Sequence, residues 1–328
     1  MKRKIAFILI IIFAILVVAV TPFIGSTKVL LSAIKDIDLA TTAGQIFYSL
    51  RLPRVFTTFL AGAALACCGV ALQAMFKNPL ATPFTLGISG GAAFGAAVYV
   101  IFAASVSIFY GPIVFSFAGS LGAVILVYGL TRIKKGFSVG TMLLAGVAVN
   151  FFFSSLIMFL QYISDFTQSF RIIHWLMGSV DVTGFHTPRV LFVLTSVGIV
   201  IIAAQSLNLN LMSISDEIAA ARGVNVKRTR KIIFLATSIM VAGVVAFCGP
   251  IGFVGLMAPH ICRLLVGHDH KILTPAAILF GGAFLTLCDC VARTIIAPAE
   301  MPVGVITALL GGPLFVWLLL KGNSEANL

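Results

Sequence analysis

The sequence predicts an all-α, polytopic membrane protein, and three observations lead to that fold class. Hydrophobic residues make up 60% of the 328-residue chain, whereas charged residues make up only 10%. A soluble domain carries roughly 25% charged residues, so most of this apolar surface must face lipid rather than water. The mean hydropathy of +1.13 agrees. Apolar stretches close to the length needed to cross a bilayer also recur along the chain.

Ten apolar stretches have about the length of a transmembrane helix, and short polar, Gly or Pro segments separate them. The eighth stretch is short and interrupted by Gly252, Gly255 and Pro259, so its limits are the least defined. We treat the whole chain, residues 1–328, as a single transmembrane domain. The predicted helices are 5–24, 55–76, 84–105, 112–131, 139–161, 190–206, 232–248, 252–266, 273–296 and 303–320.

The first stretch, residues 5–24, directly follows the basic residues Lys2, Arg3 and Lys4. A secretory signal peptide also begins with basic residues, but its apolar core is shorter and ends at a small-residue cleavage site. This stretch is long enough to cross about 30 Å of hydrocarbon, and no clear A-x-A motif follows it. We therefore expect a retained first helix with its N-terminus inside.

The distribution of basic residues predicts the orientation in the membrane. An even number of helices places both termini on one side, and fifteen of the 22 Lys and Arg residues fall on that side. Loops on the cytoplasmic side are enriched in Lys and Arg, so both termini are predicted to be cytoplasmic. The same rule accounts for the net charge of +12 without nucleic-acid binding, which is not expected as a function.

The cytoplasmic stretch between the sixth and seventh predicted helices, residues 207–231, is too polar to span the membrane. Ser213 and Asp216 fit a capping box, and Gly223 is a natural stop for a helix. The alanines between them favour helix formation. We therefore expect a short surface helix over about residues 211–224.

Small residues predict where helices pack closely. Gly87, Gly91 and Gly95 recur every four residues in the third predicted helix, which places a flat groove on one helix face. Alanines and glycines from residue 61 to residue 69 have the same effect in the second helix. Such packing makes a tight bundle, but by itself it does not indicate transport.

The sequence shows no enzymatic or metal-binding constellation. The dipeptide Gly-Lys does not occur, so the chain contains no P-loop for ATP. His268-Asp269-His270 could be considered as metal ligands, but no further ligand has suitable spacing, which favours a solvated turn. The six cysteines contain no C-x-x-C motif and predict no disulfide framework. No cofactor is expected.

Asp289 lies within the ninth predicted helix, and an acid inside the membrane is a functional candidate by default. Arg293 follows four residues later on the same helical face, so mutual neutralisation is the simpler interpretation. A proton relay at Asp289 is the alternative. It would suit an ion-coupled secondary transporter, which needs intramembrane acids for coupling.

Short motifs rich in Gly, Pro and Arg punctuate the chain from about residue 51 to residue 321. They are Arg51-Leu52-Pro53-Arg54, Asn78-Pro79-Leu80-Ala81, Leu86 to Ala92, Leu144 to Val147, Trp175 to Ser179, Gly252 to Leu256, Pro259 to Arg263, Asp289 to Arg293, Glu300 to Thr307 and Gly311-Gly312-Pro313. In order and spacing they resemble the FecCD-type permeases of ABC importers for iron–siderophore, haem and cobalamin. Each motif alone is weak, but together they are specific. Arg222 departs from the pattern, because relatives often carry Leu before the corresponding Gly.

The resemblance implies a ten-helix bundle similar to a cobalamin-importer permease, forming a homodimer around a central pathway in the cytoplasmic membrane. Two ABC ATPase subunits would bind on the cytoplasmic side and hydrolyse ATP, so the permease itself would not be an enzyme. An extracytoplasmic substrate-binding protein would deliver a siderophore, haem or cobalamin, and the lipid bilayer would surround the dimer. The choice among these substrates stays open.

The resemblance also assigns roles to three groups of residues. Each group has a plainer alternative: an ordinary loop helix, a simple loop boundary, or arginines that anchor the chain at the membrane interface. The coupling helices, at about 207–230, would contact the ATPase. The assigned residues are Glu217, Ala220, Ala221, Arg222 and Gly223 for coupling; Asn78, Leu80, Val139, Gly140 and Thr141 for a cytoplasmic gate; and Arg51, Arg54 and Arg293 for docking of the binding protein.

Overall fold

The computed structural model describes residues 2–25, 41–103, 110–133 and 139–325, and over these ranges the chain forms helices and no strands. Seven helices are long and apolar enough to cross a membrane, and three shorter apolar helices accompany them in the described part of the chain. These elements correspond one by one to the ten predicted stretches. They are α1 Lys2–Val20, α3 Leu52–Phe76, α4 Ile88–Val98, α5 Gly111–Ile133, α6 Val139–Ile163, α8 His186–Ala204, α11 Val226–Cys248, α12 Val254–Val266, α13 His270–Ala292 and α14 Val303–Glu325.

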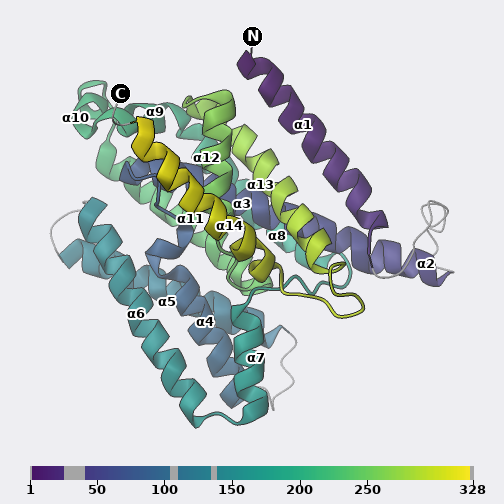
Figure 1. Ribbon diagram of the computed structural model, residues 1–328. Helices are drawn as coiled ribbons and strands as arrows, with labels where there is room; N and C mark the ends of the chain where they lie inside the picture. Colours follow the sequence, from purple (N-terminus) through teal and green to yellow (C-terminus); the bar gives the residue numbers. More distant parts are fainter. Residues whose placement is uncertain (1, 26–40, 104–109, 134–138, 326–328) are drawn as a thin grey trace.

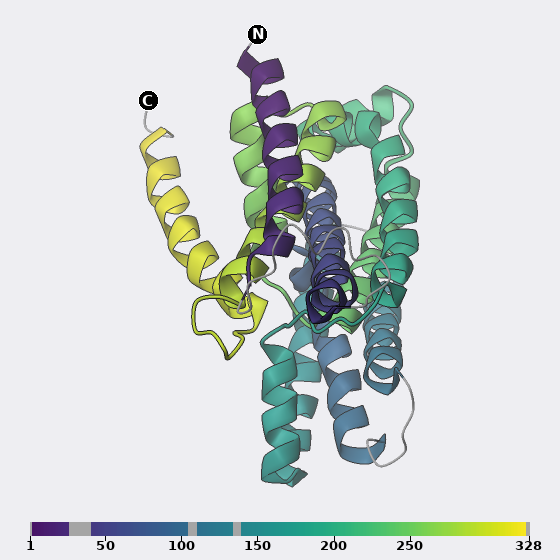
Figure 2. The same cartoon turned by 90° about the vertical axis from the view of Figure 1, so that its right-hand side faces the viewer.

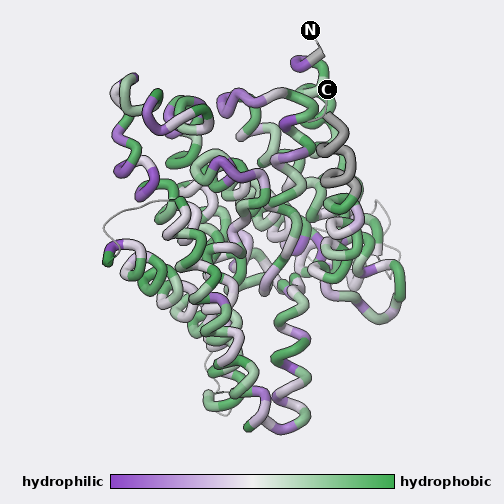
Figure 3. Tube along the Cα trace, turned by 60° about the vertical axis from the view of Figure 1, so that its left-hand side comes forward, coloured by the Kyte–Doolittle hydropathy of each residue, from purple (hydrophilic) through white to green (hydrophobic). Residues whose placement is uncertain are grey.

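Both termini lie at one end of the bundle, together with the short helices α9 (Ser206–Ile214) and α10 (Asp216–Ala221), in both Figure 1 and Figure 2. The short helix α7 (Phe166–Leu176) lies at the opposite end. Figure 3 shows hydrophobic stretches along the long helices, with hydrophilic residues mostly near their ends. This arrangement agrees with a bundle whose middle faces hydrocarbon.

Helix α3 forms the centre of the bundle, since almost every residue from Ala61 onward is buried. It packs against α8, α11, α12 and α13. Gly62 lies directly against the backbone carbonyl of Gly281 in α13, and Gly69 lies against that of Gly255 in α12. The predicted small-residue packing of this helix is confirmed, because a larger side chain at either glycine would collide with a neighbouring backbone.

The groove predicted on the third helix is confirmed at two of its three glycines. An added Cβ on Gly91 or Gly95 would collide with the carbonyl oxygens of Gly119 and Phe115, respectively, so α4 and α5 approach backbone to backbone. Gly87 is different: it adopts φ +73° just before α4, in the left-handed region that favours glycine. There it lies against Gly146 of α6.

Several predicted boundaries were wrong. The second helix begins well before residue 55, because α2 (Thr42–Gln45) and a π-helical turn (Ile46–Arg51) run without a break into α3. Pro53 lies in the first turn of α3, where the missing N–H leaves no helical bond unmade. Helix α13 ends at Ala292 instead of residue 296, while α12 continues through Pro259 uninterrupted.

The outer segment between α6 and α8 contains α7, a helix that the hydropathy pattern did not predict. Asp165 caps it: the carboxylate accepts the Gln168 backbone N–H at 2.7 Å, and the Gln168 side chain accepts the Asp165 N–H at 3.2 Å. This reciprocal pair is a capping box. The Asp-x-x-Gln spacing was therefore the sequence signal that could have revealed this helix.

Candidate docking, coupling and gating sites

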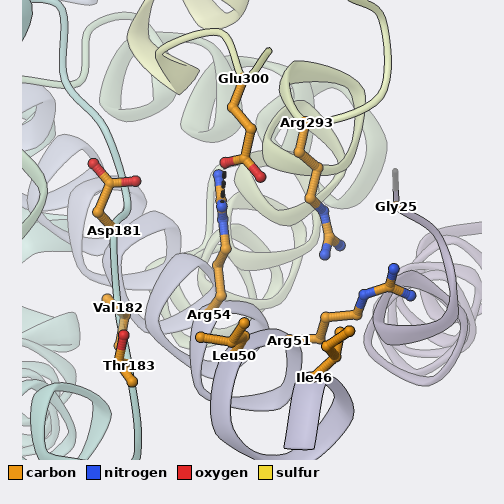
Figure 4. Close-up of a pocket in the computed structure, with 10 residues that line it drawn as sticks. All are labelled: Gly25, Ile46, Leu50, Arg51, Arg54, Asp181, Val182, Thr183, Arg293 and Glu300. Carbon is orange, nitrogen blue, oxygen red and sulfur yellow. Dashed lines mark hydrogen bonds and ion pairs between the residues drawn. The ribbon is translucent and has the colours of Figure 1, made fainter. Parts of the chain in front are cut away.

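Charged residues from the π-helical turn before α3, from α3, from α13 and from the segment after α13 meet at one end of the bundle. We call Arg51, Arg54, Asp289, Arg293 and Glu300 the outer cluster. Arg54 lies in the first turn of α3. Its Nη2 is 2.9 Å from Asp289 Oδ1, and its Nη1 is 2.6 Å from Glu300 Oε2. The Asp289 side chain is completely buried, whereas that of Glu300 is 44% exposed. Arg54 therefore joins one buried acid to one accessible acid. Figure 4 shows its contact with Glu300.

The predicted pair between Asp289 and Arg293 is present, and Arg54 is a second and closer partner of Asp289. Arg293 Nε is 3.7 Å from Asp289 Oδ2, so the pair expected from the four-residue spacing exists but is the longer of two. Arg54 makes the closer contacts from the opposite helix. Arg293 instead donates from Nη2 to the Thr21 carbonyl at 2.8 Å, which ties α13 to the end of the α1 segment.

The arginines of the outer cluster line a cavity of about 460 Å³. Asp181 lies across this cavity from Arg54, as Figure 4 shows. Three arginines therefore face two lining acids and the buried Asp289, so the cavity is close to charge-balanced. Arg51 is only 6% exposed and donates to the Pro22 carbonyl at 3.1 Å. A carboxylate could bind here most easily where Glu300, the exposed acid, now contacts Arg54.

The surface helix predicted over about residues 211–224 is present, but it is shorter and capped differently. Residues 206–221 form two helices, α9 and α10, which meet at Ser215. The Ser215 hydroxyl accepts the backbone N–H groups of Glu217 and Ile218 at 3.1 and 3.3 Å, so Ser215 is the cap. Ser213, the predicted cap, lies inside α9 and donates to the Asn210 carbonyl. The capping-box assignment was wrong by two residues.

The predicted end of α10 is confirmed. Gly223 adopts φ +84°, and its N–H donates to the Ala220 carbonyl at 2.9 Å. The N–H of Val224 donates to the Ala219 carbonyl at 3.0 Å, which completes a Schellman motif. Within α10, Ala219 is fully buried. All five residues assigned to coupling are exposed: Glu217, Ala220, Ala221, Arg222 and Gly223.

Asp216, the first residue of α10, holds two cations, and we call Asp216, Lys77 and Arg230 the inner cluster. Lys77 Nζ is 3.0 Å from Asp216 Oδ1, and Arg230 Nη2 is 2.5 Å from Oδ2. Burial acts to raise the pKa of Asp216, but the hydrogen bonds and charges of Lys77 and Arg230 outweigh it and lower that pKa. The sequence analysis did not identify these pairs.

The predicted gate residues lie on two segments, the turn after α3 and the first turn of α6. Asn78 Oδ1 accepts the Leu80 N–H at 2.9 Å, which closes a tight turn directly after α3. Leu80 is 46% exposed. The chain then packs on α6 at Gly146, while Val139, Gly140 and Thr141 form the first turn of α6. A Cβ added to Gly140 would meet no atom within 4 Å, so this turn faces open space.

A sequence model of the FecCD transport family matches residues 6–321. The chain belongs to this family. Its members transport substrates as permease subunits of ABC importers, and the predicted resemblance is therefore confirmed. The all-helical fold and the membrane-embedded character expected from composition are confirmed as well.

Named relatives extend over most of this FecCD permease. The hemin transport system permease protein HmuU of Yersinia pestis is 38% identical and covers 86% of this chain and 85% of its own. The molybdate import system permease protein MolB of Haemophilus influenzae is 35% identical and covers 92% of this chain and 88% of its own. The vitamin B12 import system permease protein BtuC of Escherichia coli is 36% identical over 87% of each.

A solved structure, described as an inward-facing conformation of a proposed metal-chelate type ABC transporter, superimposes with a TM-score of 0.84. It is 32% identical and covers 97% of this chain and 99% of its own. Because identity and coverage are both high, the likeness extends beyond the fold to the family.

The remaining polar motif of this FecCD permease has a structural role. Asp269 caps α13 by accepting the Lys271 N–H at 3.1 Å, and His270 Nδ1 lies 2.6 Å from Asn210 Oδ1. These contacts join α13 to α9. Within the described ranges, no group of three or more His, Cys, Asp or Glu residues could hold a metal ion. All six cysteines are free and buried.

Proposed function

We propose that this permease forms the membrane-spanning part of an importer in the cytoplasmic membrane. Two copies enclose a central pathway, two ABC ATPase subunits bind at the end that carries both termini, and a substrate-binding protein docks at the opposite end. ATP hydrolysis is assigned to the partner subunits, because the chain lacks the Gly-Lys dipeptide of a P-loop.

One observation carries this assignment: the two charged clusters lie at opposite ends of the same helix. Arg54 is in the first turn of α3 and Lys77 is its C-terminal cap. At 1.5 Å per residue the two positions are roughly 35 Å apart, which exceeds the hydrocarbon thickness of about 30 Å. Each cluster therefore lies near one membrane surface, with the exposed α10 on one side and the arginine-lined cavity on the other.

We infer that the substrate is a metal chelate or metal tetrapyrrole, such as a siderophore, haem or cobalamin. An apolar groove of about 480 Å³ runs beside α14 and is lined by Leu176, Met177, Pro250, Gly304, Val305, Ala308, Leu309 and Pro313. Such a wall suits a large ligand with an apolar surface. A small oxyanion such as molybdate would need hydrogen-bond donors, which these side chains do not supply.

Uptake by a deletion strain tests the substrate class. Labelled haem, ferric siderophores, cobalamin and molybdate would be offered separately to the deletion strain, with and without a plasmid copy of the gene. We expect the plasmid to restore uptake of one of the first three compounds. Restored uptake of molybdate alone would contradict the proposal.

Docking of the binding protein is proposed to occur by exchange at Arg54. Glu300 holds Arg54 Nη1 from the accessible side, so an acid of the binding protein would replace Glu300 while Asp289 keeps its own contact. An arginine suits this exchange because its planar fork binds carboxylates at two nitrogens and keeps its charge. Arg51 and Arg293 contribute positive charge to the same cavity.

Glu300→Gln tests this exchange without removing the partner of the buried Asp289. We expect the variant to bind the binding protein several-fold more tightly, with the largest gain at low salt. Asp181→Asn is the matched control, since it removes a charge from the same cavity at a residue that contacts Ser179 instead of Arg54. Equal effects of the two variants, or none for Glu300→Gln, would count against exchange at Arg54.

A further inference from the structure

The inner cluster joins three parts of the chain through one carboxylate. Asp216 begins α10, Lys77 ends α3, and Arg230 lies in the first half of α11. Each oxygen of the carboxylate serves one cation, with Lys77 at 3.0 Å and Arg230 at 2.5 Å. Exposed side-chain fractions are 34% for Lys77, 30% for Asp216 and 9% for Arg230. The link is therefore partly shielded from water and can still rearrange.

The two ends of the Lys77–Asp216 pair are adjacent to the residues assigned to coupling and gating. Asp216 immediately precedes Glu217 on the exposed surface of α10, and Lys77 immediately precedes Asn78. No other residue separates the ion pair from either group. A displacement of α10 would therefore reach the turn after α3 through a single contact.

The segments around the Lys77–Asp216 pair allow α10 to be displaced while the rest of the bundle stays in place. Helix α9 packs against α3 and α13, and its Met212 is fully buried, so α9 is fixed to the bundle. The chain changes direction at the extended residue Ser215, where α10 begins. Lys77 has φ +51° and ends α3: its N–H donates to the Ala74 carbonyl at 3.3 Å, and the N–H of Asn78 donates to the Gln73 carbonyl at 3.1 Å. The turn that follows α3 therefore begins directly at the residue that carries the cation.

We propose that Asp216 is a positioning residue that transmits the displacement of α10 to the Asn78–Leu80 turn through Lys77, while Arg230 fixes the second oxygen of its carboxylate. This inference rests on the proposed function, because it needs an ATPase that acts on α10. Opening of the cytoplasmic gate is thereby linked to ATP hydrolysis by an ion pair that itself contacts neither the substrate nor ATP.

The test measures how many substrate molecules enter per ATP hydrolysed. The permease, its ATPase and its binding protein are reconstituted in liposomes with the chelate identified by the uptake assay. We expect Asp216→Asn and Lys77→Met each to lower this ratio at least five-fold, while ATP hydrolysis and the affinity for the ATPase stay within two-fold. Lys77→Arg keeps the cation and is expected to retain most of the wild-type ratio.

Lys4→Met is the matched control, because Lys4 is an exposed basic residue of α1 at the same end of the bundle and lies outside the segment assigned to contact with the ATPase. It is expected to leave the ratio unchanged. The inference is overturned if Asp216→Asn and Lys77→Met keep the wild-type ratio, or if Lys77→Arg loses as much as Lys77→Met. It is also overturned if hydrolysis and import fall together because the ATPase binds more weakly. If the wild-type protein shows no ATP-dependent import, the proposed function itself is wrong and the inference falls with it.

Discussion

The outer and inner clusters use the same pattern of charges in different surroundings. Asp289 lies between Arg54 and Arg293 and its side chain is fully buried. Asp216 lies between Lys77 and Arg230 and is 30% exposed. A buried charge that loses its partner cannot turn to water, whereas a partly exposed one can. The comparison indicates that the pairs of Asp289 in the outer cluster act as a fixed brace between α3 and α13, and the inner cluster as a link that can be broken and remade.

The largest effect is expected from removing the central cation of the brace. Arg54→Ala leaves the carboxylate of Asp289 with only the longer contact to Arg293. We expect the free energy of unfolding to fall by about 3–5 kcal/mol, the usual loss when one member of a buried pair is removed. Thermal and denaturant unfolding in detergent would measure it.

Arg189→Ala is the control for this variant, because Arg189 is exposed on the outer side of the bundle. Its expected change is within about 0.5 kcal/mol, as for most surface substitutions. A loss below about 1 kcal/mol for Arg54→Ala would show that the outer cluster is not a brace.

A smaller effect on stability is expected at the inner cluster. Asp216→Asn weakens two partly exposed pairs, those with Lys77 and Arg230, and each such pair contributes about 0–1 kcal/mol. The unfolding free energy should therefore fall by no more than about 2 kcal/mol, in the same detergent assay. A loss as large as that of Arg54→Ala would mean that Asp216 is a structural brace too, and the contrast between the clusters would disappear.

The sequence predicted the bundle better than it predicted the contacts inside it. Apolar stretches and glycine spacing are local signals, so the ten helices and the close approach at Gly91 could be read directly. The pairs Arg54–Asp289 and Lys77–Asp216 join residues far apart in the chain. No local spacing encodes them. The sequence identifies the charged residues at each end of the bundle, but tertiary packing determines which of them form ion pairs.

Local chemistry also misled the prediction in one place. Ser213 and Ser215 are both capping residue types, and either could begin a helix with acids in its first turn. The extended backbone of Ser215 (φ −159°, ψ 147°) decides between them, since a capping residue must stand outside the helix. The chain direction after α9, which tertiary packing sets, was not available from the sequence.

The smallest effect concerns the pH dependence of the inner link. The pKa of Asp216 is lower in the folded protein than its ordinary value of about 3.9. The stabilisation from the link is therefore fully present above about pH 4 and is lost as pH falls through the lowered folded-state pKa. The difference in unfolding free energy between the wild type and Asp216→Asn should stay constant from about pH 8 to about pH 5. A difference that shrinks over that range would contradict this environment for Asp216.

ATP-driven import in liposomes tests the central claim most directly, because an ion-coupled transporter would instead use Asp289 to carry protons or sodium. Uptake of the labelled chelate would be followed in liposomes that contain the permease and its ATPase, with the binding protein outside. One set receives ATP and the other receives an imposed proton or sodium gradient without ATP. We predict uptake that requires both ATP and the binding protein, and none with a gradient alone. Gradient-driven uptake without ATP would contradict the account.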